Sequence, residues 1–301
     1  MEQGWMAIKD QGRRGHNFIL NRAYDQELGG VQERLSRFQS EWPERHIDIG
    51  GAIWSYRRTG DSTCPLVMLP GVQGGGDMFF EIGLKLGRQL DMLTVTAPPI
   101  VGVRDLADAQ AQFLHSLEIP HVDLFGSSLG GYIAQVFTIR YPHLVRRLFL
   151  SNTFVDAAPF LATQPPLAAI SRMPASYLVN SNLKSMLGAP AFDSGERALH
   201  AVLQTLVGTT QSPESYKARV LTLLGAVPVS RVPLADNEVV LIDDDADPEI
   251  LPQMRSTIRE RYRNGRRYTI EHGGHLPAVQ RPSAVIDVIC AELLSEPLSN
   301  M

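Results

Sequence analysis

The stretch VDLFGSSLGGYIAQVF, residues 122–137, decides the fold, because its apolar residues change their periodicity at a serine enclosed by glycines. Before the serine they are spaced as in a short buried strand, and after it they recur at helical intervals. The centre, residues 126–130, reads GSSLG and matches the pattern G-x-S-x-G. A strand that reverses into a helix so abruptly strains the middle residue and lifts its side chain out of the sheet. The stretch therefore predicts Ser128 as a nucleophile rather than as part of an ordinary glycine-rich turn.

The composition narrows the class of protein. The chain has 301 residues, a length that suits one large α/β domain with room for an inserted subdomain. Its formal net charge is −4. So small a net charge does not indicate a polyanionic partner or a membrane surface. The densest basic run, RERYRNGRR at 259–267, closes a predicted helix, where cations suit the negative end of the helix dipole. We therefore expect a small-molecule substrate and no nucleic-acid partner.

The cysteines and the apolar runs indicate the compartment. The two cysteines, Cys64 and Cys290, supply neither a disulfide framework nor a zinc cluster, and both are expected to be buried thiols. Residues 1–18 lack the apolar core of a signal peptide, and no apolar run reaches the length of a membrane span. We expect a soluble, reduced, cytoplasmic protein with no membrane span.

Short apolar runs alternate with amphipathic helices along most of the chain. The predicted buried strands are 65–70, 90–98, 122–125, 146–154, 238–245 and 266–271. Before them, residues 46–60 alternate like an antiparallel hairpin around Gly50-Gly51. The alternation of strands and helices predicts an α/β fold, a doubly wound, mostly parallel sheet with helices on both faces.

The alternation stops between residues 155 and 227, where helical stretches occur without a convincing strand. We expect an inserted helical cap here, because a sheet of this kind carries its site beyond the carboxyl ends of its strands. The predicted organisation is an N-terminal arm at 1–45, a first part of the core at 46–154, the cap at 155–227 and a second part of the core at 228–301. Within the arm, residues 31–42 fit either a short amphipathic helix or a loose arm.

A serine nucleophile needs a base, and the base needs an acid that orients it. His275 lies in HGGHLPAVQRP, residues 272–282, where the glycines before it let the loop approach the nucleophile closely. His272, which adjoins the preceding strand, is expected to pack or hydrogen-bond locally. His275 is therefore the predicted base.

The acid is expected after the strand that runs into VVLIDDDADP, residues 239–248. Asp247 lies far enough beyond the strand to turn back toward the nucleophile, and it is the first choice. Asp245 is the second candidate, and Asp156, beyond the preceding strand, is the third. Two backbone amides, those of Leu129 and Val72, are expected to form an oxyanion hole.

The remaining motifs do not indicate a cofactor. The acidic run at 243–247 fails the spacing of a calcium loop, because Pro248 and Met254 stand where glycine and glutamate are required. The loop GVQGGGD, residues 71–77, matches neither G-x-G-x-x-G nor a P-loop with its lysine, and Asp77 is placed to cap the next helix. We expect no metal and no other cofactor.

These motifs resemble the α/β-hydrolase superfamily over roughly residues 46–295, and within it the maspardin family. The likeness rests on IWSYRRTG…CPLVMLPGVQGGGDMFF, HVDLFGSSLGGYIAQVF and LFLSNTFVD, and on the segment around Met173-Pro174. It implies the hydrolase fold and the chain order serine, aspartate, histidine. The maspardin family is regarded mainly as binding proteins and has no histidine at the position of His275, so the intact GGH favours catalysis here. Pro70 departs from the histidine that many α/β-hydrolases carry before the oxyanion glycine.

The combined prediction is a serine hydrolase that cleaves an ester or related acyl bond of a small-to-medium, apolar substrate. Apolar residues of the cap, among them Met173 and Tyr177, are expected either to bind that substrate or to form the core of the cap itself. Two rival functions remain. One is a binding or scaffold protein with a protein partner, and the other is an enzyme of another class with the same three residues, such as a carbon–carbon bond hydrolase or an acyltransferase.

Overall fold

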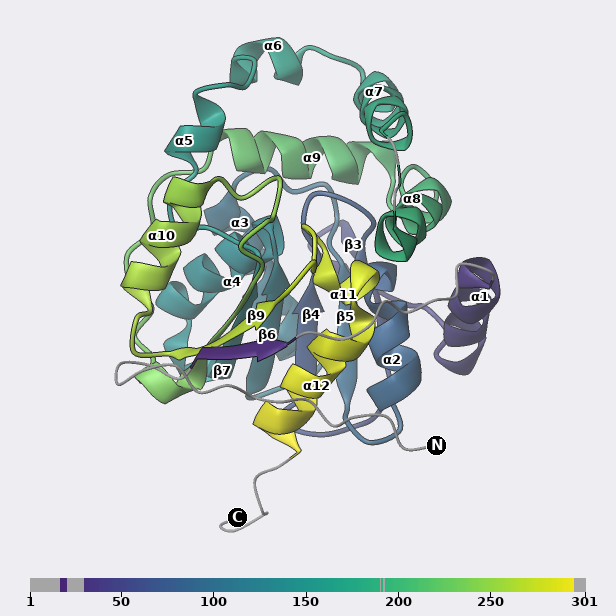
Figure 1. Ribbon diagram of the computed structural model, residues 1–301. Helices are drawn as coiled ribbons and strands as arrows, with labels where there is room; N and C mark the ends of the chain where they lie inside the picture. Colours follow the sequence, from purple (N-terminus) through teal and green to yellow (C-terminus); the bar gives the residue numbers. More distant parts are fainter. Residues whose placement is uncertain (1–16, 21–29, 190, 192, 295–301) are drawn as a thin grey trace.

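The computed structural model describes residues 17–20, 30–189, 191 and 193–294, and its strands form one nine-stranded sheet between layers of helices (Figure 1). The strands are β1 Asn17–Leu20, β2 Arg45–Ile49, β3 Ala52–Arg58, β4 Leu66–Leu69, β5 Met92–Thr96, β6 Val122–Ser127, β7 Val145–Ser151, β8 Val239–Asp243 and β9 Arg266–Ile270. Their order in the sheet is β1-β9-β8-β7-β6-β4-β5-β3-β2. Among the described residues, every pair of neighbouring strands is parallel except β2–β3 and β3–β5, which are antiparallel. The predicted mostly parallel sheet is therefore confirmed.

Helices cover both faces of this sheet. They are α1 Val31–Glu41, α2 Phe80–Leu86, α3 Val103–Ser116, α4 Leu129–Arg140, α5 Ala158–Leu161, α6 Leu167–Ser171, α7 Ala175–Leu187, α8 Ser194–Leu206, α9 Pro213–Leu224, α10 Pro252–Arg261, α11 Pro277–Gln280 and α12 Pro282–Leu293, with 3₁₀ turns η1 Gly76–Phe79, η2 Pro142–Leu144 and η3 Asp236–Glu238. In β4, Val67 and Leu69 pack toward α3, α4 and α10, whereas Leu66 and Met68 pack toward α2 and α12. A strand buried on both faces has no polar side, which is why β4 reads as a continuous apolar run.

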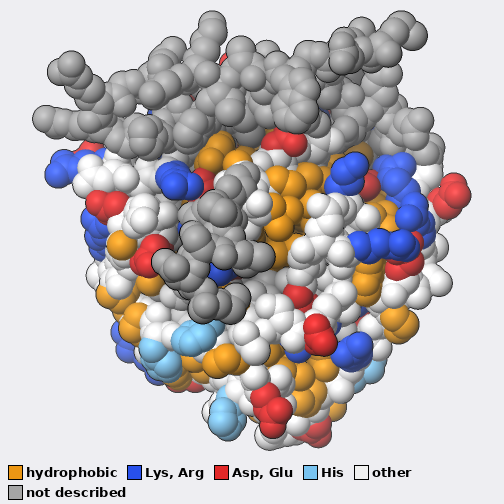
Figure 2. Space-filling model, turned by 90° about the horizontal axis from the view of Figure 1, so that it is seen from below, with side chains coloured by type: hydrophobic (Ala, Val, Ile, Leu, Met, Phe, Trp, Pro, Cys, Tyr) orange, Lys and Arg blue, Asp and Glu red, His pale blue; other side chains and the backbone are white. Residues whose placement is uncertain are grey.

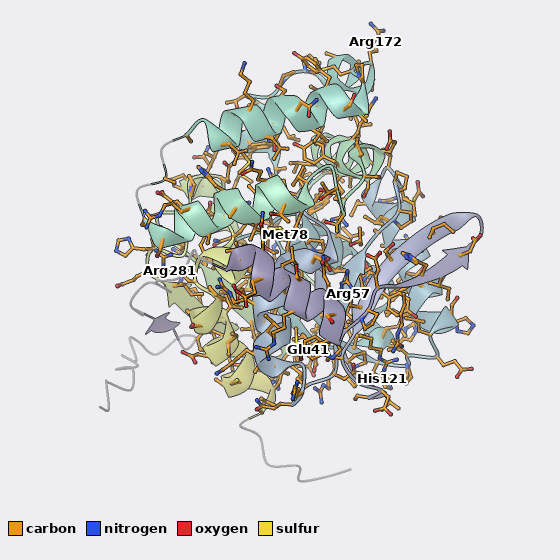
Figure 3. All side chains as sticks on the ribbon, turned by 90° about the vertical axis from the view of Figure 1, so that its right-hand side faces the viewer. Glu41, Arg57, Met78, His121, Arg172 and Arg281 are labelled. Carbon is orange, nitrogen blue, oxygen red and sulfur yellow. The ribbon has the colours of Figure 1, made fainter. Side chains whose placement is uncertain are left out.

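Part of the segment predicted as an N-terminal arm is packed against the core. β1 lies parallel to β9 at the sheet edge, and α1 contacts α2 and α8 (Figure 3). The apolar residues of α1 recur at helical spacing, and Val31, Leu35 and Phe38 are all buried. The alternative of a loose arm is therefore wrong for α1, while residues 1–16 and 21–29 of the predicted arm lie outside the described part of the chain.

A buried ion pair connects this region to the sheet. The sequence predicts Asp77 as a helix cap, but Asp77 lies inside η1, and α2 begins only at Phe80, without a side-chain cap. The Asp77 carboxylate instead accepts hydrogen bonds from Arg57 Nε at 2.7 Å and from Gln39 Nε2 at 2.8 Å. The capping prediction is wrong because the carboxylate is held in the interior by a buried guanidinium.

The helices α5 to α9 connect β7 to β8 and lie above the carboxyl ends of the strands (Figure 1). We call residues 155–227 the helical insertion. Within it α9 contacts α6 and α7, and α8 also contacts α1, α11 and η1 of the core. Near its end, the Tyr132 hydroxyl of α4 donates to the Val227 carbonyl at 2.9 Å and accepts from the Val227 N–H at 3.0 Å. The insertion is thus tied to the core near its C-terminal end and through α8.

The face opposite the insertion carries acidic and basic side chains interspersed with apolar ones (Figure 2). That mixture agrees with the small net charge of −4. Cys64 and Cys290 are half-buried rather than fully buried, and burial raises the pKa of the Cys64 thiol to about 11. Within residues 30–189 and 193–294, none of the helices has the length and apolar character that crossing a membrane requires.

Candidate active site

Ser128 occupies a strained turn between β6 and α4. Its backbone has φ 54° and ψ −123°, a conformation that side-chain-bearing residues rarely adopt. The Ser128 N–H donates to the carbonyl of Ser151 at 2.9 Å, so the turn is anchored to the neighbouring strand. A Cβ added to Gly126 would lie 2.5 Å from the carbonyl oxygen of Gly130. Glycine at position 126 therefore permits the close return of the helix that places Ser128 at the top of the sheet.

The structure brings Ser128, His275 and Asp247 together. His275 Nε2 lies 2.9 Å from Ser128 Oγ, and His275 Nδ1 lies 3.1 Å from each carboxylate oxygen of Asp247. The backbone N–H groups of Glu249 and Ile250 donate to Asp247 Oδ1, and the Asp247 side chain is fully buried. The carboxylate is therefore held in one orientation, facing the ring nitrogen that lies away from the serine.

The two other candidate acids are engaged elsewhere. Asp245 is exposed and forms an ion pair with Arg259, with 2.7 Å between Oδ1 and Nη2. Asp156 accepts a hydrogen bond from the backbone N–H of Ala158 at 2.8 Å, at the start of α5. Neither carboxylate is positioned to orient His275.

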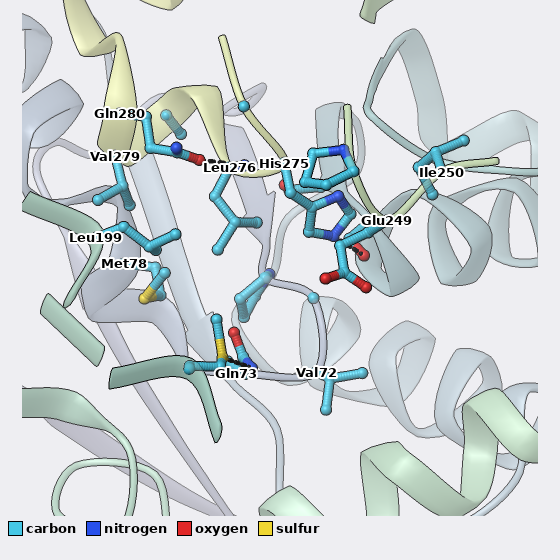
Figure 4. Close-up of a pocket in the computed structure, with 18 of the residues that line it drawn as sticks. Val72, Gln73, Met78, Leu199, Glu249, Ile250, His275, Leu276, Val279 and Gln280 are labelled. Carbon is cyan, nitrogen blue, oxygen red and sulfur yellow. Dashed lines mark hydrogen bonds between the residues drawn. The ribbon is translucent and has the colours of Figure 1, made fainter. Parts of the chain in front are cut away.

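His275 is largely buried, with 18% of its side chain exposed, and the groups around it act on its pKa in opposite directions. Burial lowers the pKa, because it penalises the charged imidazolium. The hydrogen bond and negative charge of Asp247 raise it, with a further contribution from the charge of Glu249, and together they leave the pKa of His275 above its ordinary value. Figure 4 shows the Glu249 carboxylate beside the imidazole. The surroundings of His275 therefore favour its protonated imidazolium form.

The predicted oxyanion amides lie next to the serine. Leu129 is the first residue of α4, so its N–H has no acceptor within the helix. The loop after β4 passes close to Ser128, since a Cβ on Gly71 would lie 3.0 Å from the Ser128 Cβ. Val72, the next residue, lines a pocket that Ser128 also lines (Figure 4).

Asn152 and Asp244 hold the loop around Gly274 and His275, which we call the histidine loop, and no sequence pattern predicted either residue as part of the site. The Asn152 side chain donates from Nδ2 to the carbonyls of Gly274, at 2.6 Å, and His275, at 3.2 Å. Its Oδ1 accepts from the Asp244 N–H at 3.0 Å, and an Asp244 carboxylate oxygen accepts from the Gly274 N–H at 2.9 Å. Asn152 also has a positive φ of 39°, the one signal of a special role, and this signal exists only in the folded chain.

A pocket of about 800 Å³ opens over Ser128 and His275. Its apolar wall comes from both the core and the helical insertion, and includes Val72, Phe154, Phe160, Met186, Val220 and Leu223. Its acidic residues are Asp193, Glu196, Asp244 and Glu249, and no lysine or arginine is among the described residues that line it. Across the described ranges, no three His, Cys, Asp or Glu side chains gather in a way that could hold a metal ion.

Met173 and Tyr177, predicted to bind substrate, do not line this pocket. Helix α7 turns Asn182 and Met186 toward the pocket and buries Val179 on the same side. Tyr177 lies about 200° around the helix from Val179, and its side chain is 58% exposed. The prediction is wrong because apolar character alone does not show which side of a short helix faces inward.

Comparison with known proteins identifies the family of the chain. A family model described as "Alpha/beta hydrolase family" matches residues 50–288, which is most of the chain. The chain belongs to the alpha/beta hydrolase family. The matched residues include strands β3 to β9 and the turn at Ser128, whereas β1 and β2 precede them.

Three proteins illustrate where the chain stands within the family. Maspardin of Mus musculus is 27% identical over 257 residues, which cover 82% of each chain. Pyrrolizixenacetamide deacetylase of Xenorhabdus hominickii is 26% identical over 267 residues, covering 83% of this chain and 98% of the relative. The crystal structure of the enol-lactonase from Burkholderia xenovorans LB400 has a TM-score of 0.67 at 16% identity, covering 83% of this chain and 100% of that one. The resemblance to maspardin is thus confirmed, and the fold is shared with hydrolases.

Proposed function

We propose that the protein is a serine hydrolase that cleaves an ester or related acyl bond. The observation that carries the proposal is the continuous hydrogen-bonded arrangement of Ser128, His275 and Asp247 at the base of a substrate-sized pocket. An imidazole within hydrogen-bond distance of a hydroxyl, oriented in turn by a buried carboxylate, is what activates a serine at neutral pH.

The proposed reaction has two halves. In the first, Ser128 Oγ attacks the acyl carbon while its proton passes to His275 Nε2, and the carbonyl electron pair moves onto the oxygen. The Leu129 and Val72 amides are proposed to donate to that oxygen. His275 then gives its proton to the leaving alcohol, and the acyl group remains on the serine. In the second half, a water molecule attacks the acyl carbon while His275 takes one of its protons. The resulting oxyanion collapses, the bond to Ser128 Oγ breaks to release the acid, and His275 returns the proton to Oγ, so no cofactor is required.

The lining of the pocket favours a neutral, largely apolar substrate. Its apolar wall suits an acyl chain or a ring, because removing such a group from water is favourable. Its charged lining is acidic, with Glu249 beside His275. A carboxylate or phosphate on the substrate would be repelled there without a nearby basic side chain to pair with it. Uncharged esters, rather than anionic ones, are therefore the proposed substrates.

Labelling with a fluorophosphonate probe tests the nucleophile. We expect the wild type and Ser127→Ala to be labelled and Ser128→Ala to remain unlabelled, because Ser127 belongs to β6 and is not the residue that the turn presents. Mass spectrometry of the digested protein locates the adduct. Labelling of Ser128→Ala at the wild-type rate would refute the proposal.

The same experiment separates the rival functions. A wild-type protein that no probe labels would act as a binding or scaffold protein, for which a protein partner is the expectation. Labelling of the wild type would indicate an enzyme. Its reaction class then follows from the products formed from neutral esters, neutral amides and compounds with a cleavable carbon–carbon bond. Each substrate is tested with and without an added acyl acceptor, which distinguishes hydrolysis from acyl transfer.

A further inference from the structure

The loop that carries the proposed oxyanion amide is held by a buried arginine from the helical insertion. Arg219, on α9, donates from Nη1 to the carbonyl of Pro70 at 2.9 Å and to the carbonyl of Gly71 at 2.6 Å. Its side chain lies on the inner side of the helix, where Tyr216 and Val220 line the pocket. Arg219 is only 5% exposed, so it belongs to the interior between insertion and core.

The bond to Gly71 acts directly on the Val72 amide. The Gly71 carbonyl and the Val72 N–H belong to one planar peptide unit, which is trans like the others of the described chain. In a trans peptide these two groups point in opposite directions. A donor that fixes the carbonyl therefore fixes the direction of the N–H.

Gln211, also in the insertion, holds the following part of the loop. Its Nε2 donates to the Val72 carbonyl at 2.8 Å, and its Oε1 accepts from the Gly74 N–H at 2.7 Å. The Gln211 side chain is fully buried. The peptides on both sides of Val72 are thus held by side chains of the insertion, and the loop cannot rotate its amide away without breaking buried hydrogen bonds.

Among the described residues, the guanidinium of Arg219 forms no ion pair, and its Nε is buried without a hydrogen-bond partner. Burial lowers the pKa of Arg219 to about 10, which leaves the guanidinium protonated at neutral pH. An uncompensated buried cation is costly for stability. A negative charge that develops on the other side of the Gly71–Val72 peptide would offset part of that cost.

We propose that Arg219 is a positioning residue of the oxyanion hole, which rests on the proposed serine hydrolase function. Its guanidinium orients and polarises the Gly71–Val72 peptide, so that the Val72 N–H meets the oxygen as the carbonyl electron pair moves onto it. The helical insertion thereby supports the bond-making step as well as the substrate pocket. Arg219 takes no proton and touches no reacting atom.

The test compares Arg219→Met with the wild type in two assays. One is hydrolysis of p-nitrophenyl butyrate, and the other is inhibition by an alkyl trifluoromethyl ketone, whose adduct with Ser128 bears an oxyanion. The alcohol of the same shape, which forms no adduct, measures ordinary pocket binding. We expect kcat to fall about a hundredfold and ketone affinity to fall by the same factor, as for loss of one oxyanion donor. KM and alcohol affinity should remain within about threefold.

Two further variants control this result. Lys217→Met removes another cation of α9, whose Nζ donates to the carbonyls of Ser171 and Met173 inside the insertion, and it should retain wild-type kcat. Arg219→Lys keeps a cation but not the geometry of the guanidinium, so we expect an approximately tenfold loss in kcat and in ketone affinity. If Arg219→Met does not fold, the kcat and ketone affinity of Arg219→Lys test the inference instead.

Two outcomes would overturn the inference, and a third concerns the function itself. Wild-type kcat in either Arg219 variant would show that the loop is held without the guanidinium. Equal losses of ketone and alcohol affinity would show a collapsed pocket rather than a misplaced amide. A wild-type protein that neither hydrolyses the ester nor forms the ketone adduct would refute the proposed function, and the positioning role with it.

Discussion

His275 lies between a buried carboxylate that favours its protonated form and surroundings that disfavour any charge. Burial is the largest single influence on the pKa of His275, but Asp247 and Glu249 together outweigh it and leave that pKa above its ordinary value. Protonation of His275 therefore stabilises the folded chain below the ordinary pKa of 6.5, and this contribution is lost as pH rises through the folded-state pKa. Activity should have the opposite dependence, since only the neutral ring can accept a proton from Ser128.

We predict that kcat/KM for a neutral ester rises with pH through an apparent pKa above 6.5. Asp247→Asn removes the main group that raises the pKa of His275, so the midpoint should move to lower pH. The variant should also lose turnover by about 10⁴-fold, because the amide favours the wrong tautomer of the ring. Steady-state pH profiles measure both effects, and NMR titration of the His275 ring gives the pKa directly.

Asp245→Asn is the matched control for this prediction. It removes a carboxylate from the same loop, but from an exposed ion pair with Arg259 rather than from the histidine. Its pH profile and turnover should match those of the wild type. An Asp245→Asn variant as impaired as Asp247→Asn would contradict the assignment of the acid.

Helices α7 and α9 of the insertion each have one face that lines the pocket and another that faces away from it. On α9, Tyr216, Val220 and Leu223 follow one another at intervals of four and three residues and line the pocket. On α7, Tyr177 lies on the outer face. A substitution should therefore affect substrate choice according to the face it changes, rather than according to its position in the insertion.

Leu223→Ala should shift the preferred acyl chain toward longer esters, because it enlarges the pocket by several carbon atoms. Each methylene that gains a pocket contact is worth about 1–3 kcal/mol, or roughly ten- to two-hundredfold between adjacent substrates. Tyr177→Ala should leave the chain-length profile unchanged. Values of kcat/KM for p-nitrophenyl esters from acetate to decanoate measure the shift. A changed profile in Tyr177→Ala alone would reverse this view of the insertion.

Polar contacts in the interior join segments that lie far apart in the sequence. Arg57 of β3 and Asp77 of η1 form a buried pair, and Gln39 of α1 donates to the same carboxylate. Arg57 Nη1 also donates to the carbonyl of Trp42, directly after α1. Helix α1 in turn packs on α8 of the insertion (Figure 3). Loss of the ion pair should therefore weaken the whole assembly rather than one loop.

Arg57→Met should lower the free energy of unfolding by about 3–5 kcal/mol, because it leaves the Asp77 carboxylate buried and unpaired. For a chain of this size that corresponds to a fall in Tm of roughly 10 °C. Arg88→Met is the control, since Arg88 also pairs with a carboxylate of α1, that of Glu41, but is exposed. Its loss should cost less than about 1 kcal/mol. Equal Tm values for the two variants, measured by calorimetry, would show that burial of the pair is unimportant.

The sequence alone determined the features that depend on local pattern. Apolar runs and helical spacing predicted the order of strands and helices, and the G-x-S-x-G turn predicted the position of Ser128. Asp247 and His275 were predicted from their places in loops that follow strands of the sheet and from the order serine, aspartate, histidine of the α/β-hydrolases. These predictions need only the order of residues along the chain and the known pattern of that fold.

Only the tertiary structure decided which distant side chains meet. How the insertion packs on the core determines that Tyr177 points outward and that Arg219 bonds the loop after β4. The sequence of the insertion alone is compatible with several ways of packing its helices. The bonds of Asn152 to the histidine loop, and the pairing of Asp77 with Arg57, join residues that no local periodicity connects. Because burial and pairing are properties of the packed molecule, the support around the reacting groups became visible only in the fold.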